Sequence, residues 1–193
     1  MKQGIYTITE NRPLTADVWE MRLSGDTSPL TAPGQFINIK LEGFFLRRPI
    51  SVCDWDEAGL TIIYKVVGHG TAAMAAMAPG QALDVLAGLG NGFDVGKCGQ
   101  RTLVIGGGAG VPPMYGLAKA LLAAGKTPVA ILGFNTESEI FYEDKFRALG
   151  VETTVTTVDG SYGVKGFVTA ALPEASDYFC ACGPMPMLRA VAG

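Results

Sequence analysis

The run of residues that most clearly suggests chemistry is the glycine-rich segment 106–110, GGGAG, which is followed by Pro112 and Pro113. Glycines let a backbone approach a pyrophosphate closely, and a following helix start offers unpaired N–H groups and a positive dipole end. The prolines suit the first turn of that helix. The spacing differs from the common G-x-G-x-x-G fingerprint, and a tight turn without ligand is the competing interpretation. We predict that this loop binds a dinucleotide phosphate.

The next turn of the same kind, residues 133–138, lies about where an acidic side chain meets the adenosine ribose, roughly 20 residues further on. It contains Glu137 and no Arg or Lys. A 2′-phosphate would favour a cation there, so the composition of the turn favours NAD over NADP. Glu137 could equally be a solvated residue at a helix start.

The first half of the chain holds a second set of phosphate-competent residues. Arg47 and Arg48 open a strand, and Ser51 follows three residues after Arg48. The planar fork of an arginine can hold a phosphate, and a serine hydroxyl can donate to a flavin nitrogen, although exposed arginine pairs are usually only solvated. The turn 68–71, GHGT, begins a helical run and is another potential anion site, in which His69 is best explained as a turn residue. One such turn in each half of the chain, 68–71 and 106–110, favours two nucleotide cofactors, and such a pair suits electron transfer.

Composition restricts the classes of protein that could carry these motifs. The 193 residues include 15 Lys+Arg and 18 Asp+Glu, so a formal net charge of -3 gives no electrostatic reason to expect nucleic acid or an anionic membrane as partner. An apolar fraction of 48% with 17% charged residues excludes disorder. The four cysteines are too scattered for a disulfide framework, and no apolar run is long enough to span a bilayer. We expect a soluble, cytoplasmic protein.

Alternating segments in the first half predict an antiparallel barrel or sandwich. The expected strands are short and separated by Pro and Gly turns, and one helix is expected late in this half, over residues 71–77. The strands are expected at residues 16–24, 35–41, 48–54, 60–67 and 82–86.

The second half changes to strands that alternate with helices, which predicts a doubly wound parallel sheet. We expect strands at 101–106, 128–134, 151–158 and 178–182, and helices at 112–124, 143–149, 167–172 and from 186. The fold class is therefore an antiparallel β-barrel domain, residues 1–97, followed by a doubly wound α/β domain, residues 98–193.

Several segments, taken together with the glycine loop and Gly70-Thr71, resemble a known family. They are RRPIS at 47–51, LDVLAGLGNGF at 83–93, IFYEDKF at 140–146, DGSYGVKGFVT at 159–169 and CGPMPML at 182–188. They resemble the ferredoxin–NADP reductase superfamily and, within it, the electron-transfer subunits of dihydroorotate dehydrogenase B (NAD+). The resemblance covers nearly the whole chain. Small flavin subunits of NADH-dependent ferredoxin oxidoreductases and of hydrogenases share the glycine loops and are the alternative.

The resemblance implies FAD and NAD as cofactors and assigns residues to each. For FAD it implies that Arg48 holds the pyrophosphate, that Pro49 and Ile50 line the flavin, that Ser51 lies near its reactive nitrogen, that Ile63, Tyr64 and Lys65 pass alongside, and that Gly70 and Thr71 bind phosphate. For NAD it implies Gly106, Gly107, Gly108, Ala109, Gly110, Cys182, Gly183, Pro184 and Met185, with Cys182 near the nicotinamide. Tyr64 as a core residue and Cys182 as a small buried residue are the alternatives.

The resemblance also implies a partner and a direction of electron flow. An FMN-containing dihydroorotate dehydrogenase catalytic subunit would pass electrons through a [2Fe-2S] cluster and FAD to NAD+, in a heterotetramer of pyrimidine biosynthesis. No catalytic acid or base is expected, because hydride transfer needs none. The four cysteines of the family's cluster segment are absent from this chain, so we expect a truncation. The apolar run Phe44-Phe45-Leu46 could be a partner contact or barrel core, and a nucleotide-binding module without redox turnover is a further alternative.

Overall fold

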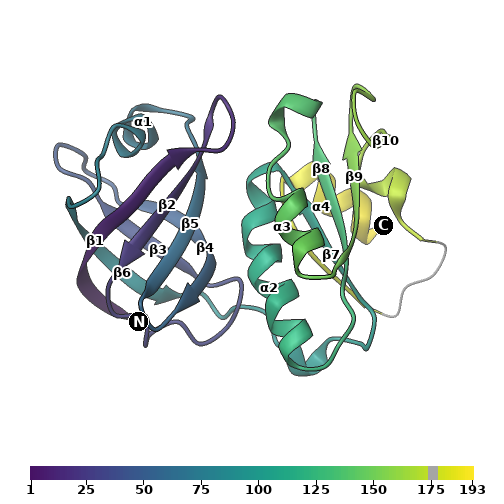
Figure 1. Cartoon of the computed structure of the whole chain (residues 1–193), viewed down its shortest axis with the longest axis horizontal. Coiled ribbons are helices and arrows are strands. Elements are labelled where there is room, and N and C mark those ends of the chain that lie inside the picture. Colours follow the sequence, from purple (N-terminus) through teal and green to yellow (C-terminus); the bar gives the residue numbers. More distant parts are fainter. Residues whose placement is uncertain (174–177) are drawn as a thin grey trace. The chain divides into compact units, whose positions relative to one another are not determined.

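The computed structural model describes residues 1–173 and 178–193, which form two compact units, Met1–Phe93 and Asp94–Gly193 (Figure 1). We predicted the division between residues 97 and 98. The segment after Phe93 instead belongs with the second unit, because its contacts are there. Lys126 Nζ donates to the carbonyl of Val95 at 2.8 Å, and the Cys98 sulfur lies 4.0 Å from that of Cys180.

The first unit is a closed antiparallel barrel of six strands, as the alternating sequence predicts. Its order is β1-β2-β5-β4-β3-β6. The strand β1 was not predicted, because only Tyr6 and Ile8 among its residues are buried and most of the others are polar. The strands are β1 (Lys2–Pro13), β2 (Val18–Ser24), β3 (Phe36–Lys40), β4 (Arg48–Asp56), β5 (Gly59–Lys65) and β6 (Ala82–Leu89).

The barrel core follows from alternation along these strands. Successive side chains of a strand point to opposite faces, so every second residue faces inward. In β3, Ile37 and Ile39 are 0% exposed, whereas Phe36 and Asn38, which alternate with them, are partly exposed. The inward residues of the six strands form one apolar cluster together with Leu30, Leu41 and Met74.

The single helix of the first unit, α1 (His69–Ala75), begins and ends two residues earlier than predicted. It begins early because Gly68 serves as its N-cap and the Thr71 hydroxyl accepts hydrogen bonds from the N–H groups of Val67 and Gly68. Its last carbonyls are capped from β1, where the Asn11 amide donates to the carbonyl of Met74 at 2.9 Å.

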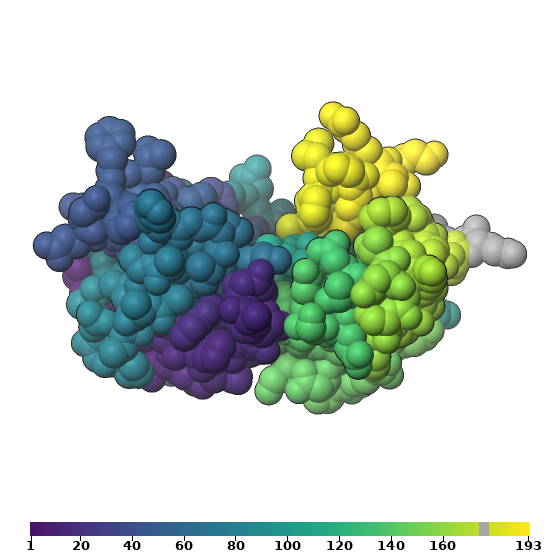
Figure 2. All heavy atoms as spheres, turned by 90° about the horizontal axis from the view of Figure 1, so that it is seen from above, coloured from purple at the N-terminus to yellow at the C-terminus, as the bar shows by residue number. Residues whose placement is uncertain are grey.

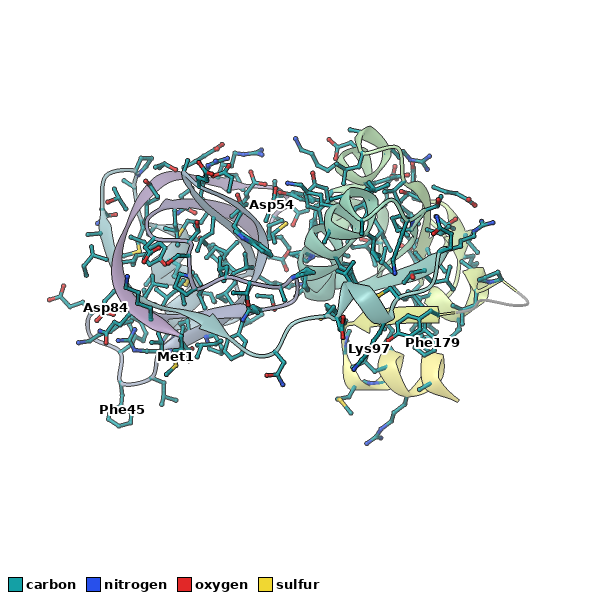
Figure 3. All side chains as sticks on the ribbon, turned by 90° about the horizontal axis from the view of Figure 1, so that it is seen from below. Met1, Phe45, Asp54, Asp84, Lys97 and Phe179 are labelled. Carbon is teal, nitrogen blue, oxygen red and sulfur yellow. The ribbon has the colours of Figure 1, made fainter. Side chains whose placement is uncertain are left out.

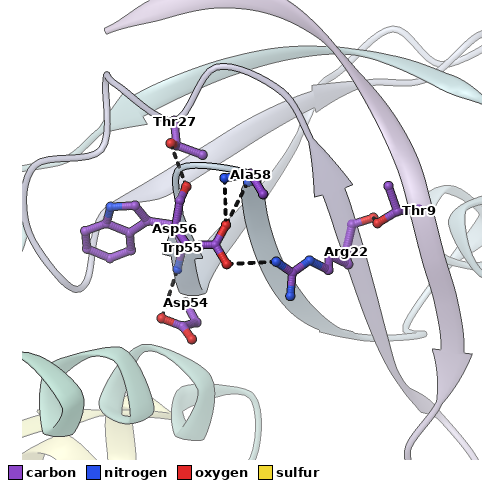
Figure 4. Close-up of polar contacts among 8 residues, drawn as sticks. Thr9, Arg22, Thr27, Asp54, Trp55, Asp56 and Ala58 are labelled. Carbon is purple, nitrogen blue, oxygen red and sulfur yellow. Dashed lines mark hydrogen bonds and ion pairs between the residues drawn. The ribbon is translucent and has the colours of Figure 1, made fainter.

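A carboxylate closes the turn between β4 and β5, the two strands that carry most of the predicted flavin residues (Figure 4). Asp56 Oδ1 accepts from the N–H groups of Ala58 at 2.8 Å and Gly59 at 3.0 Å. Its other oxygen accepts from Arg22 at 2.8 Å, and its carbonyl accepts from the Thr27 hydroxyl. The Ala58 N–H, the main cause, and Arg22 hold the pKa of Asp56 below its usual range.

The second unit has a five-stranded parallel sheet in the order β10-β9-β8-β7-β11. Figure 1 shows α2 and α3 in front of this sheet and α4 behind it, as a doubly wound fold requires. The elements are β7 (Thr102–Gly107), α2 (Val111–Ala123), β8 (Val129–Phe134), α3 (Glu143–Ala148), β9 (Glu152–Thr157), β10 (Val164–Lys165), β11 (Tyr178–Cys182) and α4 (Met185–Ala192).

Two short features of this unit differ from prediction. The helix expected over residues 167–172 is a single 3-10 turn, Val168–Ala171, since Gly166 at φ +124° precedes it and Pro173 follows. The two-residue strand β10 was also not predicted, because it is too short to show a pattern. Val168 nevertheless packs on β7 and β8, so the turn covers the sheet as the predicted helix would.

Candidate functional site

The barrel brings together two motifs that are separate in the sequence. Arg48 is the first residue of β4, and Gly70 lies in the first turn of α1. A Cβ atom at Gly70 would overlap the guanidinium of Arg48, which would have to shift to admit it. The guanidinium therefore lies against the start of α1, where N–H groups have no partner within the helix. Such a combination of donors suits a phosphate.

The two neighbouring arginines have different surroundings. Arg47 donates to the carbonyls of Asn38 and Asp84, both at 3.2 Å, and pairs with the Asp84 carboxylate at 3.0 Å, so it holds strands together. Arg48 donates to the carbonyl of Leu46 and lies over the Phe44 ring, 4.9 Å from its centre. Among residues 1–173 and 178–193 no carboxylate pairs with Arg48. Its charge is thus the one available to an anion.

The Thr71 hydroxyl, which we predicted to bind phosphate, is already fully used. It accepts from the N–H groups of Val67 and Gly68 and donates to the Gly68 carbonyl at 3.1 Å. A hydroxyl has one proton to donate and two lone pairs, so no capacity remains. Thr71 therefore shapes the turn, and any contact of this turn with phosphate falls to backbone N–H groups. His69 is exposed at the same turn.

The other flavin-side residues divide between the surface and the core. Pro49 is exposed, and Ile50 and Ser51 are partly exposed on β4. On β5, Ile63 is 4% exposed, and Lys65 pairs with Asp17 at 3.0 Å. These positions leave the β4 residues accessible to a ligand, whereas the Ile63 side chain is enclosed by protein.

Tyr64 has its ring in the barrel core rather than beside a ligand. It is 2% exposed, and its hydroxyl donates to Asn11 Oδ1 at 2.9 Å. Burial raises its pKa to about 12. The alternative that Tyr64 is a core residue therefore describes its side chain, and only the backbone of this position remains available to a ligand outside the barrel.

In the second unit, the glycine loop and the segment 182–185 meet at the carboxyl ends of two neighbouring strands. Cys182 ends β11 and is in register with Gly106 of β7. The order in which strands are added to the sheet reverses here, since β8 lies on one side of β7 and β11 on the other. In open α/β sheets, ligands bind outside the carboxyl ends of the strands at this switch point.

Three of the four glycines of this loop have packing reasons to lack a side chain. A Cβ at Gly110 would overlap the Cys182 carbonyl, one at Gly106 would lie 2.8 Å from Val111 Cα, and one at Gly107 would lie 2.5 Å from Met187 Sδ. Only Gly108 faces open space, with φ at +50°. The number of glycines alone therefore overstated the case for a ligand, whereas the position at the switch point supports it.

The segment after β11 is built around a half-buried thiol. Burial raises the pKa of Cys182, so this thiol stays protonated and is no nucleophile near neutral pH. A Cβ at Gly183 would lie 2.5 Å from Met187 Cε, and Pro184 is the N-cap of α4. Met185 is 60% exposed. In Figure 2 this C-terminal segment, coloured yellow, stands out from its unit.

At the end of β8, Glu137 has partners that sequence analysis did not single out. Its N–H donates to the Ser161 hydroxyl at 2.8 Å, and that hydroxyl donates to Asp159 at 2.6 Å. The Ser161 hydrogen bonds lower the pKa of Asp159. The signal was present in the DGS triplet after β9, but only the sheet order shows that it lies next to Glu137. The Glu137 carboxylate is exposed, so its role toward a ribose remains a prediction.

The loop before β4 carries an exposed apolar side chain. Phe44 packs against the barrel core, whereas Phe45 is 101% and Leu46 67% exposed. Figure 3 shows Phe45 pointing away from the barrel. The two interpretations of this run therefore both apply, to different residues. Phe44 belongs to the core, and Phe45 and Leu46 are free to contact another molecule.

Two further features concern the described residues. No helix there is long and apolar enough to cross a membrane. Among the same residues, no group of three or more His, Cys, Asp and Glu side chains is placed to hold a metal ion.

Comparison with known proteins agrees with this geometry. The oxidoreductase NAD-binding domain family matches residues 104–193. The chain is 43% identical over 202 residues to "Dihydroorotate dehydrogenase B (NAD(+)), electron transfer subunit" of Geobacillus sp. (strain WCH70), an alignment that covers 99% of this chain and 78% of the relative. A protein of the same name from Fusobacterium nucleatum is 42% identical over 206 residues, covering 99% of this chain and 79% of that one.

Solved structures share the fold. An NADH-dependent reduced ferredoxin-NADP oxidoreductase, described for flavin-based electron bifurcation, superposes with a TM-score of 0.85 at 30% identity, covering 96% of this chain and 70% of that chain. The ferredoxin reductase in carbazole 1,9a-dioxygenase gives a TM-score of 0.87 at 24% identity, covering 99% and 64%. The predicted barrel and doubly wound sheet are thereby confirmed.

Proposed function

This chain belongs to the family of dihydroorotate dehydrogenase B (NAD(+)) electron transfer subunits, and from that premise we propose that it carries electrons between a partner subunit and NAD+ by way of bound FAD. The observation that carries the proposal is the pairing of two anion-competent sites, one in each unit. Arg48 lies against Gly70 in the barrel, and the glycine loop meets Cys182 at the switch point of the sheet.

The residues present fit the pyrophosphate of FAD. The guanidinium of Arg48 lies against Gly70 and pairs with no carboxylate among the described residues, and the Thr71 hydroxyl holds the turn through its hydrogen bonds to Val67 and Gly68. Arg48 would hold the pyrophosphate, while Pro49, Ile50 and Ser51 would lie along the flavin. When bound, FAD supplies the ability to accept electrons singly or as a hydride. The role of the chain is to hold and orient it.

The fit to NAD lies in the shape of the second unit. Gly108 and Ala109 are the parts of the loop that face outward, above the start of α2, where N–H groups can meet a pyrophosphate. Cys182 would contribute a small, neutral side chain beside the nicotinamide. Hydride transfer requires no side chain to give or take a proton, so we assign no catalytic acid or base.

The described residues do not provide ligands for an iron–sulfur cluster. Cys98 and Cys180 lie together in the second unit, and Cys53 is buried in the barrel. This is not the four-cysteine set that such clusters require. No step of the proposal is therefore assigned to a cluster held by this chain.

The name of the relatives implies a partner subunit. We propose that it is the FMN-containing catalytic subunit that oxidises dihydroorotate, in a heterotetramer, and that Phe45 and Leu46 contribute to the contact. None of the four cysteines forms a disulfide, which supports a cytoplasmic location as part of the same proposal.

The proposal is tested by an anaerobic absorbance spectrum of the purified chain followed by titration with NADH. We expect a flavin spectrum that bleaches with NADH, because the chain holds both sites. A protein that binds no flavin, or flavin that NADH leaves oxidised, would contradict the proposed electron transfer.

A second candidate is favoured by the 30% identity to the NADH-dependent ferredoxin-NADP oxidoreductase. In that case the chain would be an NADH-dependent flavin or ferredoxin reductase subunit with a different electron partner. Copurification separates the two, since only the first function requires a dihydroorotate-oxidising subunit.

A further inference from the structure

Two thiols that neither candidate site includes lie against each other in the second unit. Cys98 follows the short turn Val95–Lys97, and Cys180 is the middle residue of β11. Their sulfur atoms are 4.0 Å apart, and the residues are 6% and 7% exposed. The proposed electron transfer uses neither of them, so the pair has no role yet.

The backbone on both sides of the pair is fixed. Cys180 is in register with Val104 of β7. The Cys98 carbonyl accepts from Lys126 Nζ, and the next carbonyl, that of Gly99, accepts from the Thr102 hydroxyl at 3.0 Å. The two sulfurs must come about 2 Å closer to reach the length of a disulfide bond, roughly 2.05 Å. Rotations of the two side chains act on that scale without moving the backbone of either residue.

We propose that Cys98 and Cys180 form an oxidisable dithiol, which hydrogen peroxide converts into an intramolecular disulfide. The first sulfur attacks the peroxide, so that an S–O bond forms, the O–O bond breaks and one water leaves. The second sulfur then displaces the hydroxyl group as a second water, and the S–S bond forms. The two sulfurs together lose two electrons, and these reduce the peroxide to water.

The surroundings of the pair limit how it can be oxidised. Burial, together with the neighbouring Cys98, raises the pKa of Cys180 to about 12, so Cys180 keeps its proton. Thiolates are the attacking species, so Cys180 must give up this proton before its sulfur can react. Because both residues are buried, only a small oxidant reaches them. A reduced flavin exposed to oxygen is one source of peroxide, and that source alone rests on the proposed function.

The disulfide would act on the strand that leads to segment 182–185. Among the described residues, β11 pairs with β7 alone and forms an edge of the sheet. A covalent bond to Cys98 gives β11 a second attachment, to the segment that precedes β7. We expect the oxidised chain to unfold at a Tm about 5 °C or more above that of the reduced chain.

The test treats the whole chain with hydrogen peroxide, blocks remaining thiols by alkylation, and measures intact mass, linked peptides and Tm. We expect the loss of two hydrogens, a peptide pair joined through Cys98 and Cys180, and reversal by dithiothreitol. Cys98→Ser and Cys180→Ser should abolish the link, whereas Cys53→Ser, in the barrel, should keep it. A bulky aromatic disulfide reagent should form the link much more slowly than peroxide does.

Three results would overturn the proposal. They are a disulfide that joins Cys182 instead, oxidation of Cys98 to sulfinic acid without a link, and unchanged thiols after Cys182 has been fully oxidised. Peptide mapping of the unmodified sequence decides among them even if a serine variant fails to fold. Failure of NADH to reduce bound flavin would contradict the electron-transfer function and leave this result unaffected.

Discussion

At the scale of single residues, neighbours with the same side chain do different work. Arg47 is bound to Asp84 and to two carbonyls of the barrel, whereas Arg48 has its charge beside Gly70 and no carboxylate partner among the described residues. The sequence shows only that the two are adjacent. Which of the two faces a ligand depends on how the start of β4 pairs with its neighbouring strands, and the sequence does not show that pairing.

The first prediction separates these two arginines. Arg48→Ala should weaken FAD binding about 10- to 100-fold, because a charge-assisted hydrogen bond to an anion contributes about 1.5–3 kcal/mol. The dissociation constant of FAD is measured by fluorescence titration of the apoprotein. Arg47→Ala is the matched control. It should lower Tm and change the dissociation constant of FAD much less than Arg48→Ala does. Equal losses of FAD affinity in the two variants would contradict the assignment.

At the scale of elements, the glycine loop shows how packing and binding select the same residue. A side chain at Gly110 would overlap the Cys182 carbonyl, whereas Gly108 adopts a positive φ in open space. The strand–loop–helix order was predictable from the sequence, because a buried apolar run precedes the glycines and prolines follow them. The packing reason for Gly110 was not predictable, since it depends on β11, which lies more than 60 residues later in the chain.

The second prediction uses this difference. Gly110→Ala should destabilise the second unit strongly, because backbone atoms of Cys182 and Gly183 must move to admit the methyl group. Gly108→Ala should cost only about 1–2 kcal/mol, the strain of a left-handed conformation. Thermal unfolding of both variants measures the difference. A Gly110→Ala chain as stable as the Gly108→Ala chain would show that the loop and β11 are not packed together.

The third prediction concerns the turn between β4 and β5. Hydrogen bonds from Ala58 and Gly59 and the Arg22 ion pair lower the pKa of Asp56 in the folded chain. The stabilisation is present above the unfolded pKa of about 3.9 and is lost as pH falls through the lower folded pKa. Asp56→Asn should therefore lower Tm at neutral pH and flatten its fall between about pH 5 and 3. A parallel acid profile of variant and parent would contradict this role.

At the scale of the whole molecule, the two units could be predicted, and their contents only partly. The change from alternating strands to strands with helices placed the boundary within four residues, at 97 instead of 93. The missed pieces have little apolar signal of their own. In β1 only Tyr6 and Ile8 are buried. The hydroxyl of the buried Tyr64 donates to Asn11, which lies on that same unpredicted strand. Long-range contacts of this kind leave no local pattern.

The fourth prediction tests the contact with the partner subunit. Phe45→Ser should reduce copurification with the partner several-fold without changing Tm or the flavin spectrum, since this side chain is 101% exposed. Ile5→Ser, at a 68% exposed apolar position on β1, is the matched control and should leave copurification unchanged. Equal copurification by the Phe45→Ser chain and its parent would exclude this loop from the interface.

The closure of the barrel sets the order in which the first unit can form. The strand β1 pairs with β2 and also with β6, where Lys2 is opposite Ala87 and Thr7 is opposite Ala82. Of the six barrel strands β1 is made first, and one of its edges stays unpaired until β6, the last of the six, is available. Contacts between such distant residues slow folding, because chain entropy is lost before they form. During synthesis, the nascent barrel thus presents an open β1 edge until β6 has left the exit tunnel, and this interval is when strand-mediated aggregation threatens the chain most.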